Sequence, residues 1–173
     1  MDLQRGSKHD YVDNKYFSVQ EVYVKLFALK NKLRILDLDK GKVTLFVNMT
    51  LEPSKSEETR QVLSDMDRIL KKFNPEKGPG QFAVYAQFTN DVDGGESRYN
   101  RDIASELIKK GLVTPQIDSR SIRFVEKADV NGLAMTDLYR VLKRQSDLFV
   151  KRYGMAVYLK EHNSKFLTNR YGQ

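Results

Sequence analysis

The chain has 173 residues, of which 40% are apolar, and it contains no cysteine and no tryptophan. This length is enough for one domain with a hydrophobic core and too short for two domains of ordinary size. The composition excludes disulfide bonds and cysteine nucleophiles, and no apolar run is long enough to cross a membrane as a helix. Because the chain begins with neither an apolar signal segment nor a basic amphipathic leader, we expect an intracellular protein, cytoplasmic or mitochondrial and not secreted.

The net charge of +7 is concentrated near the C-terminal end of the sequence. Residues 140–173 hold eight basic groups against two acidic ones, whereas the other 139 residues hold 22 against 21. Such a segment can form a basic surface that meets an acidic protein, RNA or an anionic membrane, or it is a lysine-rich solvated surface without a partner. The candidate binding residues are Arg140, Lys143, Arg144, Lys151, Arg152, Lys165 and Arg170.

The first 20 residues are polar and unpatterned, so we expect an N-terminal arm followed by one domain over residues 21–173. Residues 23–29 and 33–38 alternate apolar or aromatic residues with polar ones across a three-residue connection, which predicts a β-hairpin. Residues 43–49 are nearly continuous in apolar side chains, which is typical of a strand that is covered on both faces.

A helical period follows from residue 54 onward. Ser54 and Glu57 have the spacing of a capping box, which predicts that the helix begins there. The segment 74–80 holds two prolines and two glycines, which predicts that the helix ends before it. The apolar residues of this helix fall on one face: Val62, Met66, Ile69, Leu70 and Phe73.

Strands and helices keep alternating in the second half of the sequence. We predict strands over 81–88 and 122–126, an irregular loop over 89–99, and a terminal hairpin of 155–160 with 165–169. A helix over 100–110 turns Ile103, Leu107 and Ile108 inward and stops at Gly111. The apolar face of a further helix is Leu138, Val141, Leu142, Gln145, Leu148 and Phe149. The alternation predicts an α/β sandwich in which helices flank a central mixed sheet.

Three segments resemble the glutathione peroxidases. Residues 41–49 are similar to the first core strand of that family. Residues 124–132 read Phe-Val-Glu-Lys-Ala-Asp-Val-Asn-Gly and precede Leu138-Tyr139, which resembles the place where a family strand ends in Glu-Lys-x-Asp-Val-Asn-Gly and a helix begins with Leu-Tyr. Residues 100–103 resemble the start of the family's helix after its active-site loop. The resemblance covers most of the chain and implies a thioredoxin-like fold with an N-terminal β-hairpin.

The same resemblance implies that the catalytic tetrad is degenerate. The family keeps its reactive cysteine or selenocysteine in the loop after the first core strand, and Pro53 stands at that place. Asp91 stands at the place of the family's glutamine, and Tyr153 and Gly154 stand at the places of its tryptophan and asparagine. Because a proline cannot act as a nucleophile, we expect no enzyme activity and no cofactor.

The charges near Pro53 agree with a lost anion site. A helix N-terminus stabilises an anion such as a thiolate, and Glu52, Glu57 and Glu58 cluster where that helix is predicted to begin. These carboxylates can themselves accept hydrogen bonds from the free N–H groups at the N-terminus of the helix. The resemblance and the acidic cluster therefore both favour a scaffold without peroxidase chemistry.

Metal binding has little support in the sequence. The two histidines, His9 and His162, are far apart in the chain and no cysteine accompanies them. The acidic loop with Asp91, Asp93 and Glu96 lacks the ligand spacing of an EF-hand. We therefore expect no metal site.

Aromatic residues alternate with basic ones near the end of the chain. Tyr153, Tyr158, Phe166 and Tyr171 lie among the basic residues and could stack on single-stranded RNA. The same pattern arises when large residues of two strands fill a sheet face, and we favour this packing interpretation.

The sequence therefore favours a non-catalytic glutathione-peroxidase-like protein. The hypothesis is a structural or binding subunit of a larger assembly, such as a ribonucleoprotein or a membrane-associated complex, with protein subunits as partners and no small-molecule substrate. The alternative is a module that binds nucleic acid or an anionic surface through the basic C-terminal face. A residual redox enzyme is the third and weakest hypothesis.

Overall fold

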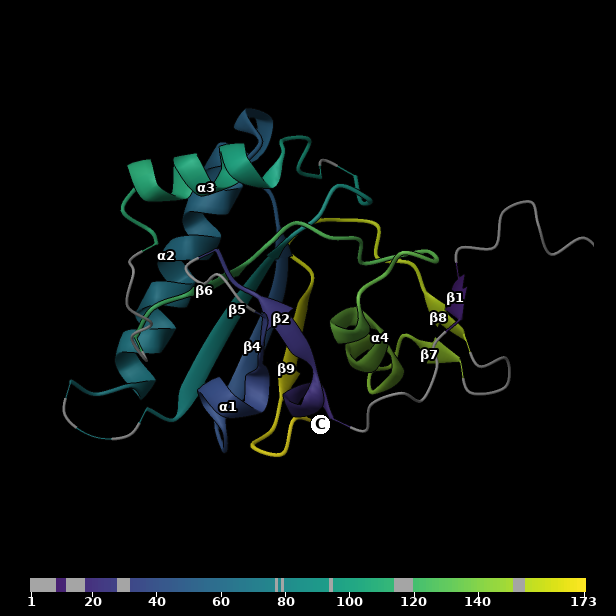
Figure 1. Cartoon of the computed structure of the whole chain (residues 1–173), viewed down its shortest axis with the longest axis horizontal. Helices are drawn as coiled ribbons and strands as arrows, with labels where there is room; N and C mark the ends of the chain where they lie inside the picture. The colour runs from purple at the N-terminus through teal and green to yellow at the C-terminus, as the bar shows by residue number, and fades with distance from the viewer. Residues whose placement is uncertain are drawn as a thin grey trace, which may run out of the picture.

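A four-stranded sheet forms the centre of the protein (Figure 1). The structure is a computed structural model that describes residues 9–11, 18–27, 32–76, 78, 80–93, 95–113, 120–150 and 155–173. The sheet has the order β6-β5-β4-β9, with β4 (Val43–Met49), β5 (Phe82–Phe88), β6 (Arg123–Val125) and β9 (Lys165–Thr168). The first three strands are parallel, and β9 runs antiparallel to β4. This mixed sheet between helices confirms the predicted fold class.

The other elements surround this sheet. A second sheet has the order β1-β8-β7, with β1 (His9–Tyr11), β7 (Phe149–Val150) and β8 (Met155–Val157). The predicted N-terminal hairpin is present as β2 (Tyr23–Lys25) with β3 (Lys32–Arg34). The helices are α1 (Ile35–Asp39), α2 (Ser56–Phe73), α3 (Asn100–Lys109) and α4 (Asp137–Arg144), and the 3₁₀ turns are η1 (Val19–Glu21) and η2 (Pro53–Lys55). None of the helices in the described part is long and apolar enough to cross a membrane.

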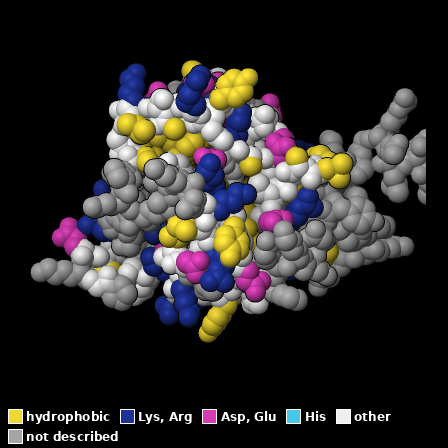
Figure 2. Space-filling view, in the orientation of Figure 1, with side chains coloured by type: hydrophobic (Ala, Val, Ile, Leu, Met, Phe, Trp, Pro, Cys, Tyr) yellow, Lys and Arg dark blue, Asp and Glu magenta, His cyan; other side chains and the backbone are white. Residues whose placement is uncertain are grey.

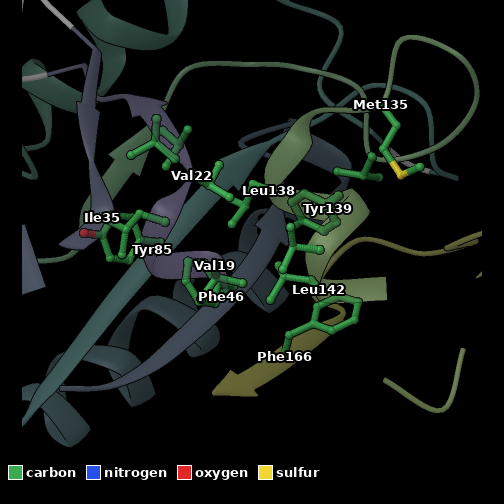
Figure 3. Packing of buried hydrophobic residues seen from close by; sticks show 14 of the residues in the cluster. Val19, Val22, Ile35, Phe46, Tyr85, Met135, Leu138, Tyr139, Leu142 and Phe166 are labelled. Atoms are coloured by element: carbon green, nitrogen blue, oxygen red, sulfur yellow. The ribbon is translucent and has the colours of Figure 1, made fainter. Parts of the chain in front are cut away.

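Both faces of the sheet are covered, because side chains alternate along each strand. Phe46 and Tyr85 face α4, the hairpin and η1, and this cluster is shown in Figure 3. Val47 and Val84 face α2 on the other side. Near the carboxyl ends of the strands, Phe88 joins Ile103 of α3. The nearly continuous apolar run of β4 is explained by this double coverage.

A buried ion pair lies beneath the hairpin side of the sheet. Asp39 is buried at the end of α1, and its carboxylate lies 2.6 Å from Arg123 Nε and 2.8 Å from Lys42 Nζ. The hydroxyl of Tyr85 donates to the same carboxylate at 2.6 Å. Burial, together with this carboxylate, raises the pKa of Tyr85. These contacts join α1 to the middle and edge strands of the sheet.

Three details of the sequence prediction are wrong. Residues 35–39 form a helix instead of the end of a strand, because Ile35 and Leu38, three residues apart, both pack inward. The terminal segments do not form a hairpin: β8 pairs with β1 and β7, whereas β9 pairs with β4. The capping box is absent, since Pro53 begins a 3₁₀ turn and Glu57 pairs with Arg60.

Some residues of the predicted helix faces also lie elsewhere. In α2, Met66 and Leu70 are buried, but Phe73 is largely exposed beside Phe82. Ile108 at the end of α3 is exposed. Helix α4 ends at Arg144, so the predicted positions 145, 148 and 149 fall beyond the helix.

Two parts of the segment expected as an arm carry regular structure. β1 pairs with β8, and Val19 of η1 is buried in the main cluster. Ser18 caps η1 through a capping box, and its hydroxyl donates to Tyr171 O at 2.8 Å. Val19 N–H donates to Gly172 O at 3.1 Å. The start of the domain is thereby joined to the segment that follows β9.

The packing of α2 gives a first prediction. Leu70→Ala should lower the free energy of unfolding by about 2–5 kcal/mol, because Leu70 is fully buried against β4 and β5. Lys71→Ala should change it by less than about 1 kcal/mol, because the ion pair of Lys71 with Asp67 is exposed. Urea denaturation followed by circular dichroism measures both changes. Equal losses in the two variants would show that the buried face of α2 is assigned wrongly.

Candidate functional site

Three loops meet at the edge of the sheet where the parallel strands end. They are residues 50–53 after β4, residues 89–99 after β5 and residues 126–131 after β6. Ala128 N–H donates to Phe88 O at 3.0 Å, and Leu51 N–H donates to Glu96 Oε2 at 2.8 Å. Ligands of open α/β sheets bind at this edge, so we place the candidate site here.

The loop before α2 is held by hydrogen bonds within the chain. Pro53 is exposed at the first position of η2, where its missing N–H costs nothing. Glu52 N–H donates to Thr50 Oγ1 at 3.1 Å, and Thr59 Oγ1 donates to Thr50 O at 2.8 Å. Together with the bond from Leu51 to Glu96, these contacts fix the loop without any bound group.

Glu96 is the buried carboxylate at the centre of this site. Its side chain is 0% exposed and accepts from Leu51 N–H, from Arg98 N–H at 3.1 Å and from Arg98 Nε at 2.8 Å. The hydrogen bonds that Arg98 donates to Glu96 raise the pKa of Arg98. Glu52 in turn accepts from the hydroxyl of Ser97 and from Ser97 N–H at 2.9 Å, which lowers the pKa of Glu52. The loop after β5 is therefore bound to the loop after β4 by two carboxylates.

Asp91 binds the loop after β6 to the loop after β5. Its carboxylate accepts from Val130 N–H at 3.0 Å, from Asn131 N–H at 2.6 Å and from the hydroxyl of Thr89. Asn131 Nδ2 donates back to Asp91 O at 3.1 Å. Burial and the nearby Asp91 charge raise the pKa of Asp129. The donors around Asp91 are thus two backbone N–H groups and the Thr89 hydroxyl, and the carboxylate binds the two loops together.

A third set of polar residues reaches this edge from the segment before β9. His162 Nε2 lies 3.1 Å from Glu58 Oε2, and Asn163 Nδ2 donates to Glu58 Oε1 at 2.9 Å. Asn163 adopts a positive φ of 63°, and its N–H donates to Asn48 O at 2.6 Å. The bond from Asn163, with a smaller effect of His162, lowers the pKa of Glu58. Glu58 thus binds the segment before β9, Glu57 pairs with Arg60 and Glu52 binds Ser97, so the acidic residues expected to cap α2 do not supply a side-chain cap.

Comparison with known proteins places the fold. No family model and no curated protein matches the chain. Among solved structures, the crystal structure of the glutathione peroxidase Trgpx in its apo form has a TM-score of 0.61 and 22% identity, over 91% of this chain and 82% of that one. The chain has a glutathione-peroxidase-like thioredoxin fold. A DsbF homologue from Corynebacterium diphtheriae has a TM-score of 0.39 and 12% identity, over 73% of this chain and 66% of that one.

The predicted tetrad positions are described in part. Pro53 and Asp91 both belong to the loops at the carboxyl edge of the sheet of this glutathione-peroxidase-like fold. Tyr153 and Gly154 lie outside the described residues, as do Lys151 and Arg152. No cluster of three or more metal-binding side chains occurs in the part of the chain that the structure describes.

The predicted basic surface needs one correction. Lys143 is 0% exposed, because α4 turns it inward; its Nζ donates to Asn131 Oδ1 at 2.8 Å and lies 5.7 Å from the ring centre of Tyr158. Arg140 is half-buried and donates to Met135 O and Leu133 O. Arg144 is half-buried, whereas Lys165 and Arg170 are exposed.

Sequence reasoning missed Glu96, Asn131 and His162 as structural members of the site. Glu96 lies in a polar loop, and nothing in its neighbours signals a fully buried carboxylate. Asn131 was noticed only as part of the family resemblance. His162 belongs to a polar run directly before β9, and the pairing of β9 with β4 would have placed that run beside Asn48.

Glu58 gives a prediction about pH. Its folded-state pKa is lowered below the value of about 4.3 expected for an unfolded chain. Its contribution to stability is therefore complete above that value and is lost as the pH falls through the folded-state pKa. Asn163→Gly keeps the positive φ but removes the donor, so the pKa of Glu58 should rise toward its ordinary value. A carbon-detected NMR titration of the Glu58 carboxyl measures this shift.

The matched control is Asn90→Gly, at an exposed position in the loop after β5. This variant should leave the pKa of Glu58 unchanged. A pKa that stays the same in Asn163→Gly, or that moves equally in both variants, would contradict the assigned hydrogen bond.

Proposed function

We propose that the protein is a non-catalytic glutathione-peroxidase-like protein that serves as a structural or binding subunit of a larger assembly. A thioredoxin-like fold can keep its architecture after its chemistry is lost, because function resides in sites and surfaces and not in the fold itself. The chain supplies no cysteine anywhere. In the described residues, the carboxylates of Glu52, Asp91 and Glu96, at the edge of the sheet that would hold a peroxidase centre, all bind other groups of the chain.

The contact between Glu96 and Leu51 carries this proposal. A reactive thiolate needs nearby backbone N–H donors or cations that stabilise its negative charge. Here Leu51 N–H, two residues before Pro53, is already bound by a buried carboxylate, and Arg98 neutralises that carboxylate. An added anion beside Leu51 would meet the Glu52 carboxylate and an N–H group that is already bound. This arrangement supports a structural junction in place of a catalytic centre.

The alternative, a module that binds RNA or an anionic surface, has weaker support. Lys143 is buried, and Arg140 donates to backbone carbonyls. On the face seen in Figure 2, the described Lys and Arg side chains lie among Asp and Glu side chains and form no continuous patch. A protein partner therefore fits this face better than a polyphosphate.

The purified protein should show no peroxide reduction with glutathione or thioredoxin as the donor. Pro53→Cys should also remain inactive, because the neighbouring Glu52 carboxylate raises the pKa of a thiol placed at position 53 and Asp91 is engaged with backbone N–H groups. A coupled NADPH assay with a donor-only blank measures both proteins. Turnover above the blank in the unmodified chain would refute the proposal of a non-catalytic protein.

The apparent size of the protein in native extract tests whether it belongs to a larger assembly. In native extract, the protein should elute far above the position of a 20.1 kDa monomer, and the apparent size should change little with salt, since buried apolar contacts are not screened. A free monomer at every concentration would remove the assembly proposal.

The RNA alternative predicts a different result. Binding by phosphate neutralisation falls steeply and linearly with the logarithm of salt concentration. We expect only weak binding of generic RNA at physiological salt. Submicromolar RNA binding that disappears in the triple variant Lys151→Glu, Arg152→Glu, Lys165→Glu would favour the alternative over the assembly.

A further inference from the structure

β9 is the last strand of the central sheet, and its outer edge pairs with no strand of the described chain. On its inner edge, Asn48 N–H donates to Ser164 O at 3.3 Å, and β9 continues in antiparallel register with β4. Hydrogen-bonded residues alternate along an antiparallel pair. The even positions of β9 therefore bond to β4, while Lys165 and Leu167 direct their N–H and C=O groups outward. Such an edge is a template for another strand.

The outer edge of β9 borders a groove of about 280 Å³. One wall is β9 itself, and the other is the end of α4 with the turn that holds Gln145, Ser146 and Asp147. Phe166 of β9 faces α4 and packs edge-on against Tyr139, with ring centres 5.9 Å apart. The groove therefore has room beside the strand edge and a polar far wall.

Leu167 is an exposed apolar side chain at the middle of this edge. It is 66% exposed and lies opposite Leu45, whose side chain packs partly against the cluster beneath α2. Leu167 thus lies on the α2 face of the sheet, where α2 leaves it uncovered. An apolar residue on an added strand would shield it from water.

Two exposed cations flank Leu167. Lys165 begins β9 and Arg170 follows its end, and neither has a carboxylate within ion-pair distance among the residues that the structure describes. By contrast, Arg60, Arg68 and Lys71 of α2 each pair with a carboxylate on the same helix. The charges beside β9 are therefore available to acidic groups of a partner.

We propose that β9 binds an extended acidic segment of a partner protein as an added strand. Main-chain hydrogen bonds to Lys165 and Leu167 supply the pairing, as in other cases of strand addition. An apolar residue of the segment covers Leu167, one acidic residue on the same face reaches Lys165, and another reaches Arg170 in the turn beyond the end of β9. The residues that face the groove are small and neutral, because Asp147 repels acidic ones. This inference rests on the proposed role as a binding subunit and specifies its interface.

The probe is the capped peptide Thr-Glu-Thr-Val-Thr-Glu-Thr, which places two acidic residues and one apolar residue on one face of a strand. Titration into ¹⁵N-labelled protein should shift the amide signals of Lys165 and Leu167 and saturate with a Kd below about 1 mM. The same peptide with lysine in place of glutamate should bind at least about tenfold more weakly. No saturable shift, or equal binding of both peptides, would overturn the inference.

Two variants test the edge directly. Leu167→Pro removes only an outward N–H and is tolerated at a strand edge, so it should abolish binding while the β4 pairing persists. Leu167→Glu should weaken binding at least about tenfold, because it removes the apolar contact and repels the acidic peptide, whereas the matched control Ile108→Glu, at a side chain of 65% exposure on α3, should not. The unchanged remainder of the amide spectrum shows that each variant is folded. Equal effects of Leu167→Glu and Ile108→Glu would refute the assigned surface.

Sedimentation of the purified protein and the size of its complex in native extract distinguish which molecule binds the outer edge of β9. A concentration-dependent dimer that Leu167→Glu disrupts would replace the acidic partner with a second copy of this chain. A native assembly that remains intact with Leu167→Glu, together with a failure of the peptide to bind the unmodified chain, would leave the proposed function standing and refute only this interface. Peptide binding at β9 by a chain that is monomeric in native extract would instead count against the proposed subunit role.

Discussion

Two carboxylates that accept backbone N–H groups hold together the edge of the sheet on which the candidate site depends. An isolated buried carboxylate is very unfavourable, but the buried Glu96 and the partly buried Asp91 each accept several hydrogen bonds from the loops around them. The loops after β4, β5 and β6 are positioned by these two side chains. The same bonds occupy N–H donors that an anionic reaction centre would need, so the interaction that holds this edge together is also the one that supports the proposed loss of peroxidase chemistry.

The elements that the sequence predicted well are those whose signal is local. The strand at 43–49 is covered on both faces and is therefore apolar throughout, and the long helix α2 shows its period over eighteen residues. Short elements carry too few residues to show a period, which is why residues 35–39 were predicted as strand. The partner of β9 depends on contacts with β4, more than 100 residues earlier in the chain, and no local pattern reports that pairing.

The sequence shows the residues on which the proposed loss of catalysis rests, but it does not show the hydrogen bonds that hold the loops of the candidate site. The absence of cysteine and the proline at position 53 are visible in the sequence, as is the acid at position 91. Burial cannot be read from the sequence, and it decides the roles of Glu96 and Lys143. Both are charged residues that are expected at the surface but are fully buried here. Lys143 is buried because Asn131 and Tyr158 receive its ammonium group, and both partners lie on other elements.

The free energy of unfolding of Glu96→Gln tests the central claim most directly. If Glu96 is a structural junction, this nearly isosteric change should lower the stability by about 2–4 kcal/mol, because it removes the charge that binds Leu51 N–H and Arg98. A matched change at the less buried Glu52 should cost less. Residues kept for chemistry are commonly held at the expense of stability, so a Glu96→Gln protein that is equally or more stable would contradict the account.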